Sequence, residues 1–402
     1  MKFPLCLLAV CLFAVPSIAA APKTFTVKGE DLASVKAKFQ QNDPTLKPAL
    51  AALVKEADQA LQEGPFTIVN KPITPPSGDK HDYMSLSPYW FPNPDKPDGL
   101  PYVRKDGVVN PEREKFDLPK IESFTMNANT LALAYYFTGD EKYATKAAEL
   151  MRVWFFDEAT RMNPNVKYAQ VVRGVEEDGR ANGVLEADRF RRVIDADALL
   201  AGSKSWTSDD SDKLREWIKQ FSDYLRTSEQ GKKELGQKNN HGSWATVQIA
   251  TYALYLGDDA FAKKLIETEG KKRIASQIEP DGRQPLELER TKAFDYSRFN
   301  LLALMQLATI GERVGVDLWN YKTDDGRSIR AAIDWLAPYG TGEKKWDYEQ
   351  ITDAKWQDLY NILRRASNAY HEPKYEAMAQ KVKNADPATS RVNLLYPASK
   401  SE

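Results

Sequence analysis

Cysteine is almost absent from this sequence. Of its 402 residues only Cys6 and Cys11 are cysteine, and both lie in the opening segment MKFPLCLLAVCLFAVPSIAAAP. That segment has one lysine, an apolar stretch that ends near Val15 and then small residues, a layout typical of a secretory signal peptide. We therefore predict a signal peptide at residues 1–21 and a periplasmic or secreted mature chain, 22–402. Without cysteine, that chain can form neither disulfides nor thiolate metal sites.

An excess of charge of either sign is also missing. Lys and Arg number 56, Asp and Glu number 57, and the formal net charge is −1. Loss of the leader removes one lysine and no acid, which leaves the mature chain at −2. Nucleic-acid-binding proteins are usually clearly basic, so we predict no nucleic-acid partner. The apolar run of the leader is too short for a typical membrane span, and we predict no span.

Histidine is scarce as well. His81, His241 and His371 are the only three in the sequence, and they stand in unrelated contexts. No H-E-x-x-H motif pairs two of them, and no glycine-rich loop has a phosphate-binding pattern. Because neither metal-ligand spacing nor a nucleotide motif is present, we predict neither a metal nor a cofactor.

Helical periodicity is what the sequence has in quantity. Apolar residues recur at three- and four-residue spacing in residues 44–63, and from 122 onward the chain repeats pairs of helices joined by short turns. The clearest pairs occupy 131–151, 248–267 and 359–382, with related pairs around 186–229 and 299–338. No strand pattern interrupts them. We predict an all-α fold, an (α/α) toroid that forms an incomplete barrel of about six to seven helix hairpins in a single domain.

Residues 70–118 differ sharply from the helical part. They are rich in Pro, Gly and aromatic residues, and the density of Tyr83, Tyr89 and Trp90 argues against a disordered linker. Long ordered loops inside a compact domain are usually functional. We call residues 70–118 the aromatic loop, and we predict that its residues 78–103 line or cover a cleft.

Two segments place polar residues at the start of an apolar helix. In KNNHGSW, Asn239, Asn240 and His241 stand at or before a helix N-terminus. The free N–H groups and partial positive charge of such an end suit an anion. In ELERTKAFDYSRFNLLALMQLA, Arg290 and Tyr296 precede or open another long helix. Two helix starts at the same end of a toroid can face one cleft.

Asn, His, Arg and Tyr together fit β-elimination across a glycosidic bond next to a uronic acid. Arg290 and Asn240 can bind the carboxylate and stabilise the charge that develops when C5 loses its proton. A base removes that proton, and an acid protonates O4 of the leaving sugar. Tyrosine has an ordinary pKa near ~10, and a nearby Arg favours its phenolate, so Tyr296 can shuttle the proton. The structural alternatives are a turn and helix cap around His241 and a core position for Tyr296.

Four motifs in order give the sequence a specific resemblance. GDKHDYMSLSPYWFPNPDKPDGLPY, MNPNVKYAQ, NNHGSW and ERTKAFDYSRFNL look like those of the alginate-lyase-domain polysaccharide lyases. The resemblance runs over residues 60–380. The chain is most similar to polysaccharide lyase family 38, whose members cleave glucuronan or alginate, and more distantly to the family 5 alginate lyases.

The resemblance implies an α/α toroid with a metal-free site. Asn240 and His241 match the Asn-His of the family motif, and Arg290 and Tyr296 match its Arg and Tyr. In the family 5 pattern one more residue separates that Arg and Tyr. The implied activity is β-elimination of 1,4-linked polyuronate, an anionic polysaccharide, to give 4,5-unsaturated ends. His241 would lie beside C5 of the bound uronate, as the base for one epimer or as a carboxylate-binding group.

Further residues are predicted to bind substrate around these four. Aromatic faces stack on sugar rings, and Arg can hold a carboxylate through two hydrogen bonds. The predicted binding residues are Lys80, His81, Tyr83, Tyr89 and Trp90 in the aromatic loop, Tyr168, Gln170, Arg173 and Arg180 in a later polar stretch, and Asn239 and Trp244 beside the Asn-His pair.

Two other functions remain open on the residues alone. A glycoside hydrolase on the same toroid needs two carboxyl groups flanking the bond, and the candidates are Glu176, Asp178, Glu287 and Glu289. A non-catalytic polyuronate-binding protein would use aromatic residues of the two polar stretches as stacking platforms. The sequence does not distinguish mannuronate, guluronate and glucuronate, endo from exo action, or the oligomeric state.

Overall fold

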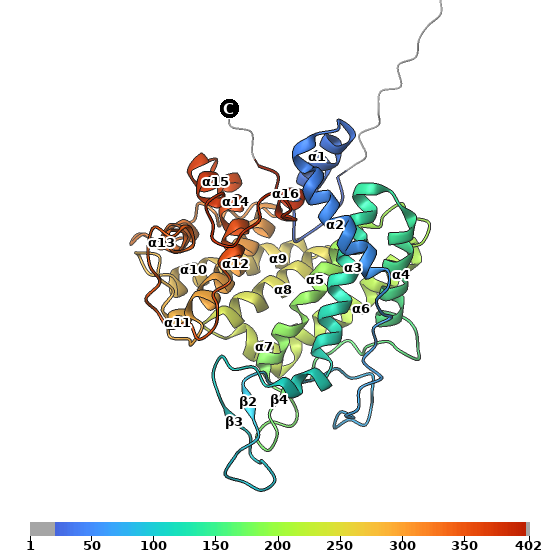
Figure 1. Cartoon of the computed structure of the whole chain (residues 1–402). Coiled ribbons are helices and arrows are strands. Elements are labelled where there is room, and N and C mark those ends of the chain that lie inside the picture. The colour runs from blue at the N-terminus through green and yellow to red at the C-terminus, as the bar shows by residue number, and fades with distance from the viewer. Residues whose placement is uncertain (1–20, 399–402) are drawn as a thin grey trace, which may run out of the picture.

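Helices make up nearly all the regular structure of the chain (Figure 1). The computed structural model describes residues 21–398, so the predicted signal peptide lies, except for Ala21, outside the described residues. Within that range no helix is long and apolar enough to cross a membrane. The helices are α1 (Gly29–Gln40), α2 (Lys47–Ala60), α3 (Leu118–Thr138), α4 (Glu141–Phe155), α5 (Phe190–Leu199), α6 (Ser208–Thr227), α7 (Glu229–Leu235), α8 (Asn240–Leu256), α9 (Asp259–Leu265), α10 (Lys271–Gln277), α11 (Pro285–Leu288), α12 (Ala293–Glu312), α13 (Ile329–Thr341), α14 (Leu359–Tyr370), α15 (Pro373–Ala379) and α16 (Val392–Leu395). The strands are β1 (Met84–Leu86), β2 (Trp90–Phe91), β3 (Val103–Arg104) and β4 (Tyr168–Val171).

The predicted helix hairpins are confirmed. The three clearest sequence pairs form α3–α4, α8–α9 and α14–α15. Their first helices end at residues in the left-handed backbone region, namely Gly139 at φ 73°, Gly257 at φ 84° and His371 at φ 55°. A left-handed residue ends a helix and turns the chain back, which makes the two helices of each pair antiparallel neighbours.

The inner helix α8 is mostly apolar and is buried on every side. In α8 every residue from Gly242 to Tyr255 is buried. The helix sends Tyr252 into the core of the N-terminal helices and Val247 into the core of the C-terminal helices. A helix that is apolar all round must be covered all round. Accordingly α3, α5, α8 and α12 pack in sequence, and α2, α4 and α9 cover them from outside. The all-α toroid is therefore as predicted.

The short strands are not foreseen by the sequence. β1 pairs in parallel with β4, with Met84 opposite Tyr168, and β2 pairs antiparallel with β3, with Trp90 opposite Arg104. Strands of two to four residues carry too little alternation to be recognised from sequence. The pairing joins the aromatic loop to the polar stretch after α4 and gathers β2, β3 and β4 below α7 in Figure 1.

A buried ion pair anchors the aromatic loop to the start of α3. Lys71 Nζ lies 2.8 Å from Asp117 Oδ2, and both side chains are completely buried. The ammonium also donates to the carbonyls of Ile68 at 2.9 Å and Lys80 at 2.8 Å. The backbone N–H of Met84 donates to Asp117 at 3.0 Å. Because buried charges need such partners, this pair dictates how the loop leaves the body of the toroid.

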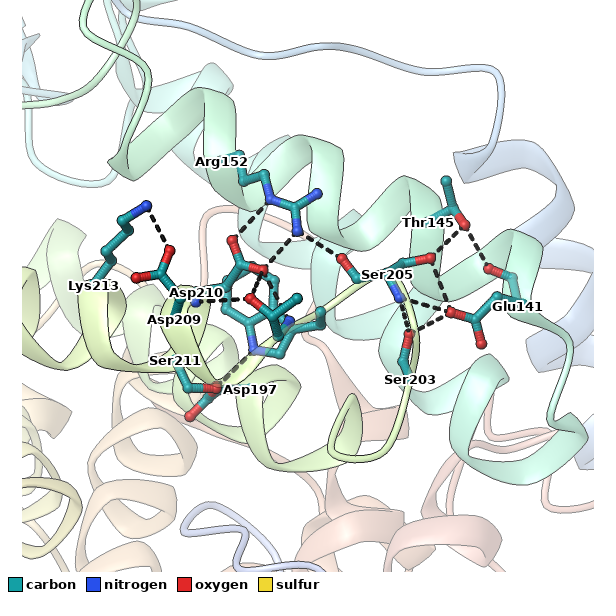
Figure 2. A network of polar contacts seen from close by, with 12 residues as sticks. Glu141, Thr145, Arg152, Asp197, Ser203, Ser205, Asp209, Asp210, Ser211 and Lys213 are labelled. Atoms are coloured by element: carbon teal, nitrogen blue, oxygen red, sulfur yellow. Dashed lines mark hydrogen bonds and ion pairs between the residues drawn. The ribbon is translucent and has the colours of Figure 1, made fainter.

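A second polar network ties the turn between α5 and α6 to α4 (Figure 2). Arg152 donates from Nε and Nη2 to the two carboxylate oxygens of Asp210, at 2.8 and 2.6 Å. Asp210 also accepts from the backbone N–H and the hydroxyl of Thr207 in the capping box of α6. Burial by itself would raise the pKa of Asp210, but the hydrogen bonds from Arg152 and Thr207 outweigh it and hold the pKa at about 2.

The Asp210→Asn variant should be less stable than wild type at neutral pH and should lose that disadvantage in acid. The folded-state pKa of about 2 lies below the ordinary 3.8. The carboxylate therefore stabilises the fold above the ordinary value, and its contribution is lost as the pH falls through the folded value. Because Arg152 is partly exposed, we expect a loss of about 1–2 kcal/mol at neutral pH.

Urea unfolding from neutral pH down to about pH 2 measures the effect. Asp209→Asn is the matched control, since the exposed carboxylate of Asp209 faces only Lys213 on the surface and its removal should change the free energy of unfolding little. The expectation would be contradicted if the difference in free energy of unfolding between wild type and Asp210→Asn did not become smaller as the pH falls.

Candidate active site

The starts of α8 and α12 face a single cavity of about 880 Å³. All four residues predicted to be catalytic line it, namely Asn240, His241, Arg290 and Tyr296. Five of the predicted binding residues line it as well, namely Tyr89, Trp90, Gln170, Arg180 and Asn239. The sequence therefore placed two distant helix starts correctly in one cleft, while the roles of these side chains stay predictions.

The cavity is far more basic than the chain as a whole. Six Lys or Arg side chains and only two carboxylates line it, and these are Arg104, Arg180, Arg290, Lys292, Arg298 and Lys355 against Asp295 and Asp353. In a chain of net charge −1 this is a local concentration of positive charge, which suits an anionic ligand. Among residues 21–398, no three or more His, Cys, Asp or Glu side chains are grouped so that they could hold a metal ion.

Two buried carboxyl groups stand behind the Asn-His pair at the start of α8. Asn239 caps the helix by accepting from the backbone N–H of His241 at 3.2 Å. Glu287 accepts from the backbone N–H and the side-chain amide of Asn240, each at 2.7 Å. Oε1 of Glu234 lies 2.5 Å from Nδ1 of His241. Burial raises the pKa of Glu287, and the two hydrogen bonds from Asn240 lower it by less. Asn240 and His241 both line the cavity; the side chain of Asn240 is completely buried, and that of His241 is partly exposed.

Arg290 and Tyr296 form the other half of the centre. Nη2 of Arg290 donates to Tyr296 Oη at 2.9 Å, and the guanidinium carbon lies 3.8 Å from the centre of the phenol ring. Asp106 holds the guanidinium by accepting from Nε at 3.2 Å and from Nη2 at 2.8 Å. Tyr89 Oη lies 2.8 Å from Tyr296 Oη. The aromatic loop thus supplies a direct partner to both residues.

The surroundings of Tyr296 favour its neutral phenol form. Burial raises its pKa above the ordinary 10.0, Tyr89 adds to the rise, and Arg290 lowers the pKa by less. The expected assistance of Arg290 to the phenolate is therefore present, but burial outweighs it. The ion pair between Arg290 and Asp106 keeps Asp106 charged. Burial would raise the pKa of Asp106, but the hydrogen bond from Arg290 lowers it below the ordinary 3.8. The centre thus presents a proton donor beside a fixed cation.

Gln170 is held at the cavity wall in a strained backbone conformation. Its φ of 52° lies in the left-handed region, which is unfavourable for a residue with a side chain. The N–H of Gln170 donates to Ser85 Oγ at 2.7 Å, and that hydroxyl donates to the buried Glu186 at 2.5 Å. Strain that the surroundings maintain in this way is characteristic of functional sites.

Three of the predicted binding residues are packing residues instead. Tyr83 is completely buried and donates to Glu186 at 2.9 Å. Tyr168 is 3% exposed in the small core under the loop. Trp244 is 7% exposed and its ring centre lies 5.0 Å from that of Phe299, so Phe299, and not Trp244, reaches the cavity. The prediction that these three line the cleft is wrong, because burial of a large ring in the core competes with its use as a sugar platform.

Three polar residues also lie outside the cavity wall. Lys80 and Arg173 are exposed elsewhere on the surface, and Nδ1 of His81 lies 2.6 Å from the carbonyl oxygen of Arg161. The prediction that Lys80 and His81 line the cleft is therefore wrong, and binding of a carboxylate by Arg173 at a neighbouring subsite stays a prediction. The loop reaches the cavity only from Ser87 onward, after β1 has paired with β4.

The structure adds residues that the sequence did not single out. Asp106 and Glu234 contact the predicted catalytic side chains, and Asn182 lies with its amide nitrogen 3.4 Å from both ring nitrogens of His241. Glu234 precedes His241 by seven residues, a spacing that two helical turns would place on one face, although a loop separates the two. Nothing local marks Asp106, which lies far from Arg290 in the chain.

The Trp90→Ala variant should weaken substrate binding more than it lowers the melting temperature. Trp90 is half-buried at the cavity wall, with the Arg180 guanidinium 5.8 Å from its ring centre, so its ring is available to stack on a sugar. We expect roughly a 10-fold weaker binding of polyuronate oligosaccharides. Phe91→Ala, next on β2 and outside the cavity wall, is the matched control. The opposite ranking of the two effects would make Trp90 structural.

Comparison with known proteins shows the family and the fold of the chain. The family profile described as alginate lyase matches residues 67–346. The solved structure of an alginate lyase from Bacteroides ovatus is similar with a TM-score of 0.89 at 42% identity, covering 94% of this chain and 100% of that one. Alginate lyase A1-III from Sphingomonas species A1 shares the fold, with a TM-score of 0.59 at 19% identity over 96% of this chain and 99% of that one. No curated protein matches the sequence.

Proposed function

Because the chain belongs to the alginate lyase family, we propose that it cleaves 1,4-linked polyuronate, alginate or glucuronan, by a metal-free β-elimination. The observation that carries the proposal is the contact of Arg290 Nη2 with Tyr296 Oη at 2.9 Å, in the basic cavity that Asn240 and His241 also line. A fixed cation beside a proton donor is what elimination next to a carboxylate requires.

The proposed reaction begins with binding of the uronate carboxylate. Arg290 receives it, with its guanidinium kept in place by Asp106, and Asn240 stabilises the enolate-like charge that forms after C5 loses its proton. The electron pair left on C5 then forms the C4–C5 double bond as the bond from C4 to O4 breaks. Tyr296 donates its phenol proton to O4, and the product carries a 4,5-unsaturated end.

The base depends on the epimer. In guluronate the C5 proton and O4 lie on opposite faces, so we assign the base to His241 and the acid to Tyr296. In mannuronate and glucuronate they lie on the same face, and we assign both transfers to Tyr296, which starts as the phenolate, takes the C5 proton and returns it to O4. Arg290 favours that phenolate, although burial keeps the pKa of Tyr296 above the ordinary 10.0 when no substrate is bound.

A glycoside hydrolase receives less support. None of Glu176, Asp178, Glu287 and Glu289 lines the cavity. Of the two carboxylates that do, Asp295 accepts from the backbone N–H of Lys355 at 3.0 Å. Inverting and retaining hydrolases both need a pair of carboxyl groups across the scissile bond. A non-catalytic polyuronate-binding protein would leave the polymer intact, and the assay below separates it from a lyase.

Export is part of the proposal. Residues 1–21 have the charge and apolar layout of a signal peptide, so we propose that the protein acts in the periplasm or outside the cell, where polymeric substrate is met. Full-length expression followed by determination of the N-terminal residue of the extracytoplasmic protein tests this.

One assay tests the activity and the sugar together. The protein is incubated with glucuronan, polymannuronate and polyguluronate, and the ultraviolet absorbance of the conjugated double bond is followed. A lyase produces this absorbance with at least one polymer. A hydrolase produces new reducing ends without it, and a binding protein produces neither, so either result would overturn the proposed function.

A further inference from the structure

Glu234 is a buried acid that does not reach the cavity. It lies on α7 with a completely buried side chain, and Oε1 stands 2.5 Å from Nδ1 of His241. Among the described residues its second oxygen, Oε2, has no hydrogen-bond partner. A buried carboxyl with an unsatisfied oxygen lowers the stability of a fold. Because Glu234 lowers the stability of the fold, its presence points to a role that it performs through His241, the residue it contacts.

The contact selects one tautomer of His241. An ionised carboxylate only accepts hydrogen bonds, so Nδ1 carries the hydrogen. The neutral ring then has its lone pair on Nε2. The imidazole ring of His241 is 16% exposed, whereas the carboxyl group of Glu234 is not exposed at all. A ligand in the cavity can therefore contact the imidazole but not the carboxyl group. An imidazole in this state is a base at Nε2.

The surroundings make such a partner necessary. His241 stands in the first turn of α8, beside the partial positive charge of the helix end. The carboxylate of Glu234 offsets that charge. Of the other charged groups nearby, Arg273 on α10 donates to the carbonyls of Leu235 at 2.6 Å and Gln237 at 2.9 Å, which holds the segment between α7 and α8. Glu287 faces Asn240 instead.

We propose that Glu234 is a positioning residue that commits Nδ1 of His241 as a donor and so makes Nε2 the base that takes the C5 proton. The inference rests on the proposed function and deepens it. The proton moves from C5 to Nε2, and the imidazolium keeps its Nδ1–H bond to Glu234. The C5 electron pair becomes the double bond as O4 leaves with the proton of Tyr296. Glu234 therefore matters where His241 is the base, in the cleavage of guluronate.

The tautomer is measured directly by long-range hydrogen–nitrogen correlation spectra of the imidazole rings. The chain has only three histidines, and the His241→Gln spectrum assigns the ring of interest. Wild-type His241 should be protonated at Nδ1 in its neutral form. In Glu234→Gln the side chain can donate to Nδ1, so a large share of the rings should carry the hydrogen on Nε2. Glu229→Gln, the same change at an exposed position of α7, should leave the spectrum as in wild type.

Kinetics on matched homopolymers provide the functional readout. Glu234→Gln should lower kcat on polyguluronate by about 10²-fold and leave KM within about 3-fold, since the carboxyl group does not touch substrate. On polymannuronate or glucuronan the change in kcat should stay below about 3-fold. Melting temperature reports whether the variant folds, and the wild-type spectrum decides the proposal even if the variant does not.

The possible failures are distinguishable. A wild-type protein that forms no unsaturated product from any polyuronate sinks the proposed function, while the spectra still decide the tautomer. A wild-type His241 protonated at Nε2 overturns the inference about Glu234. So does a Glu234→Gln variant with the wild-type tautomer and the wild-type kcat on every polymer that the protein cleaves.

Discussion

The Tyr296→Phe variant should lose elimination on every polyuronate that the wild-type protein cleaves. The substitution removes one hydroxyl group and keeps the ring that stacks under the guanidinium of Arg290 at 3.8 Å. In the proposed mechanism the phenol donates the proton to O4 for every epimer, so its loss should affect every substrate. General acid–base catalysis contributes about 10²–10⁴-fold, and we expect kcat to fall by at least about 10³-fold with the fold intact.

Two further Tyr→Phe variants separate proton transfer from packing. Tyr89→Phe removes the same hydrogen bond from its other end, so a smaller loss there shows that the proton of Tyr296 is what matters. Tyr143→Phe removes a phenol that donates to Asp58 at 2.8 Å outside the cavity, and it should keep the wild-type rate. Near wild-type turnover of Tyr296→Phe on any homopolymer would refute the assignment, and the proton would then have to pass through His241.

The Arg290→Gln variant should show the second largest loss of activity, after Tyr296→Phe. Without the guanidinium the carboxylate next to C5 stays charged, the C5 proton is only weakly acidic, and the phenol loses the cation that lowers its pKa. We expect kcat/KM to fall by about 10²–10³-fold, with most of the loss in kcat. Separate measurement of kcat and KM on the preferred homopolymer shows how much of the loss in kcat/KM comes from each.

A double variant distinguishes loss of catalysis from damage to the site. Arg290→Gln removes the principal partner of Asp106 and leaves it with Arg104 and Thr291, and this loss at a partly buried carboxylate could by itself distort the aromatic loop. The double variant Arg290→Gln with Asp106→Asn removes that charge. Its activity should remain as low as that of Arg290→Gln alone. Recovery to within about 10-fold of wild type would mean that Arg290 only neutralises Asp106 and does not act on substrate.

The centre of the site was predictable because its signals are local. A helix start is marked by Asn239 and the residues that follow it, and the apolar run of α12 marks the place of Tyr296. Hydrogen bonds of a cap close within three residues of the chain, so composition reflects them directly. Arg290 is six residues from Tyr296, and the two side chains meet through a turn of the same segment.

The supporting residues were not predictable because their contacts are distant. Asp106 and Arg290 are separated by 184 positions, and Asn240 and Glu287 by 47. A carboxyl group that will be buried behind a catalytic side chain looks, in the sequence, like any surface acid. Only packing shows that Glu287 has one per cent of its surface exposed, contacts Asn240 and does not line the cavity.

The sequence by itself determined the helices, their pairing into hairpins and the two helix starts that carry the Asn-His and Arg-Tyr pairs. Periodicity and capping are properties of short segments, and tertiary contacts rarely reverse them over long apolar helices. The tertiary structure alone decided which loop residues face the cavity, so that Tyr89 and Trp90 line it while Tyr83 is buried under the loop. Successive side chains of an extended segment point in opposite directions. The direction is chosen only when β1 pairs with β4 and the large rings compete for the core.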